Sequence, residues 1–204
     1  MGGRARRTGV ARGSRVNVVL GLDPGTRHFG WGIVAKNGTR LSHVAHGVCD
    51  VDKVGELGDR LVAIERALVE VIARYKPSQA SIETLFFAKD ASAAAKLGHA
   101  RGVALLVCTR AGIESFEYAP ARVKRTVAGA GRADKTQVAQ MVRVVLGLPE
   151  APRSDAADAL AIAVTHLQGS PLLGANGPAR GFSGRANAKP ALQAILRGAR
   201  SSNR

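Results

Sequence analysis

The stretch Val16-Asn-Val-Val-Leu-Gly-Leu-Asp-Pro-Gly-Thr26 places a short, β-branched apolar run directly before an acidic turn. Branched apolar residues favour a buried strand, whereas Asp, Pro and Gly favour a turn. The stretch therefore predicts a strand that ends at Asp23, beside a loop. Residues 29–35 and 40–48 resume extended patterns on either side of Asn37-Gly38, a dipeptide typical of hairpins. We expect three consecutive antiparallel strands.

Downstream of this hairpin the pattern alternates between helices and short strands. Apolar residues three and four apart predict an amphipathic helix over residues 55–75. We expect two further strands, at residues 80–83 and 113–118, and four further helices, over residues 90–110, 120–128, 134–146 and 155–167. Strands joined by helical crossovers are parallel, so the first, fourth and fifth strands should be parallel. The predicted fold is α/β, a five-stranded mixed sheet with three antiparallel and then parallel strands, flanked by helices.

Positive charge is concentrated at the two ends of the chain. The 204 residues carry a net charge of +15, with five Arg and no acid in residues 1–15 and six basic residues and no acid in residues 170–204. We expect a disordered basic arm over residues 1–15, one folded domain over 16–168 and a basic, low-complexity tail over 169–204. Such arms bind polyanions without sequence preference, which makes nucleic acid the expected partner.

Composition disfavours several other classes of protein. The chain has no run of eighteen consecutive apolar residues and no apolar secretory segment after its basic start, so we expect neither a membrane span nor a signal peptide. Cys49 and Cys108 form no C-x-x-C pair, which excludes a zinc ribbon and indicates ordinary thiols in a reducing compartment. We therefore expect a cytoplasmic protein.

Four acidic residues differ from the surface charges of the predicted helices. Asp23 and Glu83 each end an apolar strand, where open α/β sheets place their sites. Asp155 and Asp158 are three residues apart at the start of a helix, so both project from one face of its first turn. Taken singly, they have ordinary explanations: Asp23 as a turn former, and Asp155, after Ser154, as a helix cap.

Taken together, the four carboxylates predict a metal site. A cluster of acids repels itself unless cations are bound. Oxygen ligands without Cys or His select a hard cation such as Mg²⁺, which Mn²⁺ can replace. Two such ions, on the order of 4 Å apart, activate a water and stabilise the leaving oxygen of a phosphodiester. We expect two Mg²⁺ per subunit and hydrolysis of a nucleic-acid backbone.

Four runs in this sequence carry a resemblance to a known family: Gly-Leu-Asp-Pro-Gly-Thr (21–26), Ser-Ile-Glu (81–83), Lys-Leu-Gly-His-Ala-Arg-Gly (96–102) and Ser-Asp-Ala-Ala-Asp-Ala-Leu-Ala (154–161). In order and spacing they resemble the bacterial RuvC family, the crossover junction endodeoxyribonucleases or Holliday junction resolvases. The resemblance covers roughly residues 16–168. It implies a ribonuclease H-like fold, a homodimer, dependence on Mg²⁺, and action alongside the RuvA and RuvB branch-migration proteins.

The same resemblance implies paired, symmetric nicks across a four-way DNA junction during homologous recombination and DNA repair. Asp23, Glu83, Asp155 and Asp158 match the family's four acidic positions and are therefore expected to bind metal and act in catalysis. Some members have His at the third position, where this chain has Asp155.

A basic stretch over residues 122–153 is the expected DNA-binding surface. By resemblance, Lys124 and Lys135 match positions that contact phosphates near the scissile bond, and we add Arg125 and Arg132 as expected contacts. A solvated helix face is the alternative interpretation.

Two adjacent aromatic residues, Phe86 and Phe87, follow Glu83 in a predicted loop. Phe86 matches the family position for base stacking or for a wedge that keeps the junction centre unpaired, and we expect Phe87 to pack into the core. The Ala-rich segment over residues 91–104, with Gly98 and Gly102 spaced for close helix approach, is the expected dimer seam, although it could equally pack on the sheet. We expect the five histidines to be structural.

Other functions remain as alternatives. The motif around Asp23 also resembles the first phosphate motif of actin-like sugar kinases and chaperone ATPases, but 204 residues hold only one of the two similar halves that such a protein needs. Residues 129–136 nearly fit a P-loop, but Asp134 stands where its second glycine belongs and would oppose a phosphate. A non-catalytic junction-binding protein and a nuclease for RNA–DNA hybrids both stay open.

Overall fold

The computed structural model describes residues 16–84, 91–169 and 179–180. Its sheet contains β1 (Asn17–Asp23), β2 (His28–Asn37), β3 (Arg40–Asp50), β4 (Gln79–Glu83) and β5 (Glu114–Tyr118). Its helices are α1 (Leu57–Tyr75), α2 (Ala91–Arg110), α3 (Pro120–Ala128), α4 (Lys135–Leu146) and α5 (Ser154–Gln168). All five strands and all five helices expected from the sequence are confirmed.

The sheet order is β3-β2-β1-β4-β5-β6, where β6 is a short edge strand at Ala179–Arg180. β1, β2 and β3 pair antiparallel, whereas β1 with β4 and β4 with β5 pair parallel, as predicted. Gly38 has φ +59° at the tip of the β2–β3 hairpin, the conformation that the Asn-Gly turn requires.

One strand was not predicted. β6 (Ala179–Arg180) pairs antiparallel with β5, within the segment expected to be tail. The backbone of an edge strand can pair with almost any sequence, so a pairing of two residues leaves no pattern to recognise. The prediction of a five-stranded sheet therefore misses this short addition at the edge.

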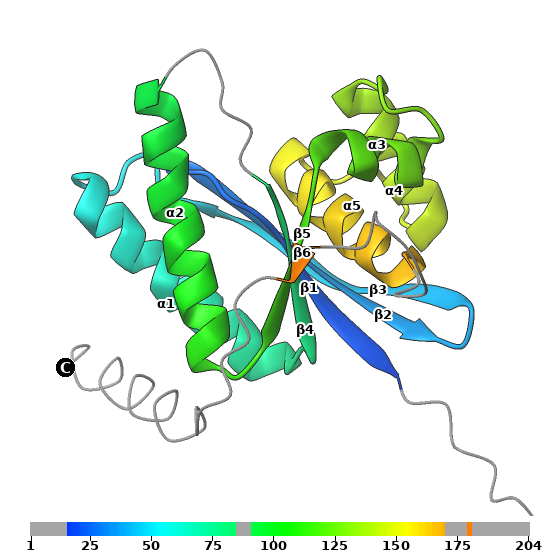
Figure 1. Ribbon diagram of the computed structural model, residues 1–204, viewed down its shortest axis with the longest axis horizontal. Helices are drawn as coiled ribbons and strands as arrows, with labels where there is room; N and C mark the ends of the chain where they lie inside the picture. The colour runs from blue at the N-terminus through cyan, green and yellow to red at the C-terminus, as the bar shows by residue number, and fades with distance from the viewer. Residues whose placement is uncertain (1–15, 85–90, 170–178, 181–204) are drawn as a thin grey trace, which may run out of the picture.

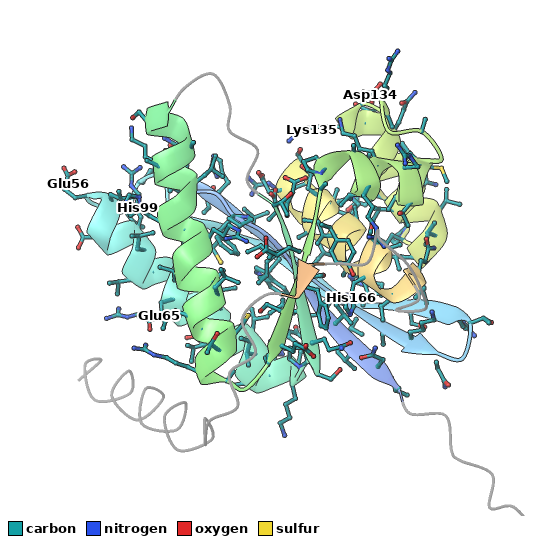
Figure 2. The ribbon with its side chains drawn as sticks, viewed as in Figure 1. Glu56, Glu65, His99, Asp134, Lys135 and His166 are labelled. Atoms are coloured by element: carbon teal, nitrogen blue, oxygen red, sulfur yellow. The ribbon has the colours of Figure 1, made fainter. Side chains whose placement is uncertain are left out.

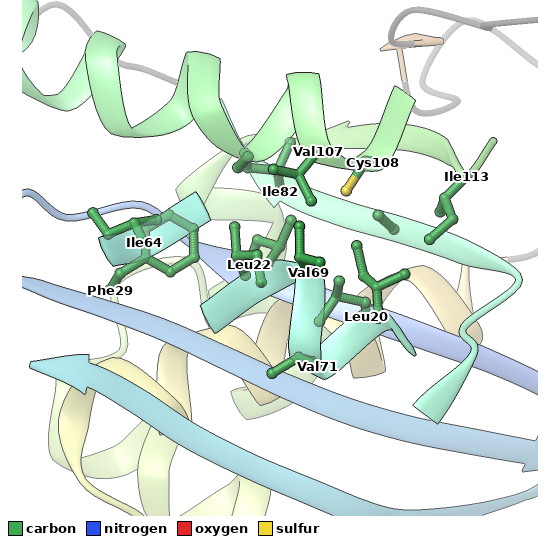
Figure 3. Packing of buried hydrophobic residues seen from close by; sticks show 14 of the residues in the cluster. Leu20, Leu22, Phe29, Ile64, Val69, Val71, Ile82, Val107, Cys108 and Ile113 are labelled. Carbon is green, nitrogen blue, oxygen red and sulfur yellow. The ribbon is translucent and has the colours of Figure 1, made fainter. Parts of the chain in front are cut away.

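Helices cover both faces of the sheet (Figure 1): α1 and α2 lie on one face, and α3, α4 and α5 lie on the other. The first face is buried by a cluster that includes Leu20, Leu22, Phe29 and Ile64 (Figure 3). The second is buried by a cluster that includes Val19, Val34, Tyr118, Val142 and Leu160. Within the described residues, no helix is long and apolar enough to cross a membrane.

The alternation of side chains along β1 and β4 fixes the face on which the acids lie. Leu20 and Leu22 of β1 and Ile82 of β4 belong to the α1–α2 side. Successive side chains of a strand point to opposite faces, so Asp23 and Glu83 lie on the opposite side, the side that α5 covers.

Candidate active site

Two neighbouring strands deliver Asp23 and Glu83 to one edge of the sheet. β1 and β4 are parallel, with Leu22 paired to Ile82, so each strand reaches its acid one residue later. Both side chains are half-buried. The two carboxylates therefore end adjacent strands at the same edge and on the same face, as the sequence predicts.

The first turn of α5 brings the other two acids to this edge. Asp155 and Asp158 are half-buried, while Ala156 and Ala157 between them are buried. The residue at the N-cap is Arg153, which makes no side-chain capping bond. The ordinary explanation of Asp155 as the cap of this helix is therefore wrong, and its carboxylate is available for another role.

Burial and mutual repulsion show that the four acids form one electrostatic cluster. Burial, followed by the charges of Asp158 and Glu83, raises the pKa of Asp23 to about 8, and Asp155 adds to this effect. Burial and the charge of Asp158 likewise raise the pKa of Glu83. In the absence of bound cations, Asp23 is therefore largely protonated at neutral pH.

Lys135 is the cation that enters this cluster. Its Nζ lies 3.1 Å from Oδ2 of Asp158, which joins the start of α4 to the start of α5. That hydrogen bond and the charge of Asp158 raise the pKa of Lys135, and its ammonium in turn lowers the pKa of Asp23 and Glu83. Lys135 thus partly neutralises an excess of negative charge.

A capping box at the N-terminus of α4 fixes the position of Lys135, the first residue of this helix. Oδ1 of Asp134 accepts a hydrogen bond from the backbone N–H of Gln137 at 2.8 Å, and Oε1 of Gln137 accepts one from the backbone N–H of Asp134 at 3.1 Å. This capping box explains the acid that breaks the P-loop pattern. Figure 2 shows Asp134 and Lys135 together at this end of α4.

The donor set suits a hard divalent cation. The four carboxylates supply only oxygen ligands, and their repulsion is relieved by added positive charge. Within residues 16–84 and 91–169, no three His, Cys, Asp or Glu side chains stand in a group that could hold an ion as they are placed. Binding would therefore require the acids to lose the Asp23 proton and to draw closer together.

The other expected DNA contacts differ in their electrostatic effect on the acids. Lys124 on α3 is half-buried, and its charge lowers the pKa of Glu83, which places it beside the acids. Arg125 and Arg132 are exposed and are not among the charges that shift the pKa of Asp23 or Glu83. Phe86 and Phe87 lie outside the described residues.

A polar network behind the site was missed by the sequence reasoning. The hydroxyl of Tyr118, whose backbone pairs with that of Glu83, lies 2.8 Å from Nδ1 of His166. Nε2 of His166 lies 3.0 Å from Oε1 of Gln79. Since the amide oxygen can only accept, Nε2 donates and Nδ1 accepts from the Tyr118 hydroxyl. Burial lowers the pKa of His166 to about 4, which supports the structural role expected for this histidine.

The α2 segment proposed as a dimer seam faces two ways. Ala100 and Ala104 are buried against the sheet side. Gly102 is exposed, with no heavy atom within 4 Å of the position that a Cβ would occupy, and Leu106 is 46% exposed. The alternative that this segment packs on the sheet is therefore confirmed for Ala100 and Ala104, while Gly102 stays open to solvent in the single chain.

Comparison with known proteins identifies relatives along most of the chain. A relative from Sorangium cellulosum named crossover junction endodeoxyribonuclease RuvC is 60% identical over 149 residues, which cover 73% of this chain and 83% of that protein. A relative of the same name from Ruegeria pomeroyi is 52% identical over 150 residues, covering 72% and 89%.

Solved structures are also similar to this chain. The Thermus thermophilus RuvC in complex with a Holliday junction substrate is 40% identical, with a TM-score of 0.70, and covers 74% of this chain and 93% of that one. The yeast mitochondrial Holliday junction resolvase Ydc2, at 12% identity and a TM-score of 0.51, shares the fold alone, over 76% of this chain and 81% of its own. The ribonuclease H-like fold is confirmed by these neighbours.

The family model described as crossover junction endodeoxyribonuclease RuvC matches residues 19–166, a span that runs from within β1 to within α5 and contains all four acids. This chain belongs to the RuvC family.

Proposed function

We propose that this chain is a structure-specific DNA endonuclease that resolves four-way junctions by paired, symmetric, metal-dependent hydrolysis during recombination and repair. The observation that carries the proposal is the electrostatic cluster of Asp23, Glu83, Asp155 and Asp158 at the edge of the sheet. Membership of the RuvC family and the likeness to a RuvC bound to a Holliday junction support the choice of substrate.

The four acids are the proposed metal ligands, with Mg²⁺ as the cation and two ions per subunit; Mn²⁺ should substitute. Bound divalent cations supply a Lewis acid for the scissile phosphate and lower the pKa of an attacking water. The chain's own part is to hold four carboxylates on a rigid strand edge and a buried helix. The fold brings the four acids near one another before any substrate binds, and bound cations would draw them closer; this prior approach reduces the entropic cost of reaching the transition state.

Lys135 and Lys124 are the proposed phosphate contacts beside the reaction centre, because both reach the acids electrostatically. Lys135 is 72% exposed, so its ammonium can leave Asp158 and donate to a phosphate oxygen. Arg125 and Arg132, which are exposed, are proposed to hold the DNA arms, and Phe86 to act at the junction centre.

A homodimer is proposed because a four-way junction is roughly two-fold symmetric and each chain holds one acidic cluster. The exposed face of α2 around Gly102 and Leu106 is the proposed seam. Action with RuvA and RuvB, and a cytoplasmic location compatible with the free thiols Cys49 and Cys108, complete the proposal.

The domain boundaries are part of the same proposal. Residues 16–168 form the nuclease domain, and the basic segments 1–15 and 169–204 add affinity for DNA without sequence preference.

The test is cleavage of a synthetic four-way junction, compared with plain duplex and an RNA–DNA hybrid, in the presence of Mg²⁺. The proteins are the wild type, Asp23→Asn and the control Glu70→Gln, which removes one exposed carboxylate of α1. We expect symmetric nicks in the junction alone, lost in Asp23→Asn while junction binding persists. Binding without cleavage by the wild type would indicate a non-catalytic junction-binding protein, and cleavage of the hybrid would indicate a ribonuclease.

A further inference from the structure

We propose that Gly30 is a positioning residue that sets the height of the first turn of α5 above the sheet and thereby holds Asp155 and Asp158 against Asp23. The inference rests on the proposed metal-dependent function. It concerns a residue that carries no reactive group and that acts only through the backbone of another.

The register of the sheet places Gly30 directly beside Asp23. The two residues are paired across the β1–β2 ladder. Since Val34 belongs to the α5 side of the sheet, the alternation along β2 puts Gly30 and Gly32 on that same side. Any side chain at Gly30 would therefore point at α5, next to the acid that ends β1.

The space above Gly30 is filled by the backbone of Asp155. A Cβ added there would lie 2.0 Å from the carbonyl oxygen of Asp155 and 3.2 Å from its Cβ. Atoms that are not bonded to each other do not approach so closely, and a carbonyl within a helix cannot rotate away without breaking the helix. Even a methyl group would force the first turn of α5 to rise.

The other two glycines under α5 meet the helix beyond Asp158: a Cβ at Gly21 would lie 2.0 Å from the carbonyl oxygen of Ala159. A Cβ at Gly32 would lie 2.7 Å from Cδ2 of Leu160 and 3.0 Å from its backbone nitrogen. The nearest atoms belong to the side chain of Leu160, two residues after Asp158, and this side chain can shift more easily than a backbone carbonyl. A substitution at Gly32 therefore disturbs packing in the core while leaving the first turn in place.

The displacement expected at Gly30 is local. Leu160, Ile162 and Val164 are buried and anchor the body of α5. Only the end that carries the acids would be lifted from the strand edge. An alanine at position 30 therefore separates two of the four carboxylates from the other two, while the sheet and the basic surface stay intact.

The experiment compares wild type, Gly30→Ala, the matched control Gly32→Ala, and Gly58→Ala, where a Cβ enters open space. Mn²⁺ binding is measured by calorimetry, and junction binding is measured without metal. For Gly30→Ala we expect the Mn²⁺ concentration at half-saturation to rise about 10- to 100-fold, as when groups that orient metal ligands are lost, with junction binding retained. Gly32→Ala should lower the melting temperature and keep the Mn²⁺ affinity.

Two results would overturn the inference: wild-type Mn²⁺ affinity in Gly30→Ala, or an equal loss in Gly32→Ala. If Gly30→Ala fails to fold, Ala156→Val replaces it, because Ala156 is buried in the same turn and added methyl groups there would also displace that turn. Wild-type Mn²⁺ affinity in a folded Ala156→Val would likewise overturn it. A wild type that neither binds Mn²⁺ nor cuts junctions would instead refute the proposed function, so the two failures are distinguishable.

Discussion

The ammonium of Lys135 and a carboxylate oxygen of Asp158 lie 3.1 Å apart, 23 residues from one another in the chain. This ion pair joins two helices at the edge where all four acids meet. It also puts the chain's own cation at a position where a divalent ion would compete for the same oxygen.

Lys135→Met should tighten metal binding and weaken cleavage at the same time. Removing the ammonium frees Asp158 and removes repulsion toward an incoming cation, so the Mn²⁺ concentration at half-saturation should fall several-fold. Junction cleavage should fall at least tenfold, because the phosphate contact is lost. Calorimetry and single-turnover cleavage measure the two effects, with the exposed Lys53→Met as control. Metal affinity that falls together with cleavage would contradict the competition.

Asp23→Asn should stabilise the metal-free protein at high pH. The pKa of Asp23 is raised from 3.8 to about 8 in the folded state, so the folded state binds this proton more tightly than the unfolded state. The free energy of unfolding of the wild type therefore falls as the pH rises from about 4 to about 8. Asparagine carries no charge, so the free energy of unfolding of Asp23→Asn should not fall in this way as the pH rises.

Thermal melts of wild type and Asp23→Asn, with chelator present, measure this effect between pH 4 and pH 9. The melting temperature of Asp23→Asn should exceed that of the wild type at pH 8, and the difference should shrink toward pH 4. Glu70→Gln, an exposed position, should follow the wild type throughout. A difference in melting temperature that does not change with pH would show that the charge of Asp23 does not destabilise the folded state.

His166 should make the fold sensitive to acid. Its pKa is lowered from 6.5 to about 4, so between these pH values the unfolded state binds a proton at this histidine and the folded state does not. The contribution to stability is complete above pH 6.5 and is lost as the pH falls from 6.5 to about 4. His166→Gln should be less stable at pH 7.5, because it loses the bond to Tyr118, but its stability should vary less across that window.

Melting temperatures at half-unit steps of pH test this prediction, with the exposed His99→Gln as control. Equal pH dependence in His166→Gln and wild type would assign the acid sensitivity to another group.

Removing the basic ends should change how binding responds to salt. A chain cut to residues 16–180 keeps β6 and loses the five Arg of residues 1–15 together with the basic residues after position 180. Fewer released counterions should flatten the slope of log affinity against log salt, while cleavage of a bound junction continues. An unchanged slope, measured by fluorescence anisotropy, would show that the ends do not contact DNA.

Bulk on the outer face of α2 should weaken the proposed dimer. Gly98→Leu and Leu106→Lys place an oversized group or a charge at the proposed seam. Sedimentation velocity should show a shift toward monomer in both variants. Leu97 is also exposed, but it lies nine residues from Leu106, about 2.5 turns, and therefore on the opposite side of the helix; Leu97→Lys is the matched control. Unchanged sedimentation of both seam variants would move the interface elsewhere.

Much of this architecture was accessible from sequence patterns because the patterns are local. The apolar runs before Asp23 and Glu83 each predict a strand and the residue at which it ends. The spacing of Asp155 and Asp158 predicts that both lie on one face of a helix. The parallel order then brings all four to one edge.

Contacts between distant segments were not accessible. Nothing in the sequence places Lys135 against Asp158, or the carbonyl of Asp155 against Gly30, because both contacts depend on how closely helices seat on the sheet. The contact between His43 and His46 was also not accessible from the sequence, although the two residues are close in the chain. A register shift between Ile33 and Val34 opposite them turns both imidazoles to one side, with ring nitrogens 2.8 Å apart, where a regular strand would separate them.

The burial of α5 determines when, during folding, the four acids can come together. Ten of its residues, from Ala156 to Leu167, are buried, so this helix seats only when the sheet beneath it is complete. A newly made or damaged chain whose core has not closed holds Asp23 and Glu83 without their two partners. If the four acids are the proposed metal site, such a chain lacks a complete site, and the nuclease would become active only after folding has been completed.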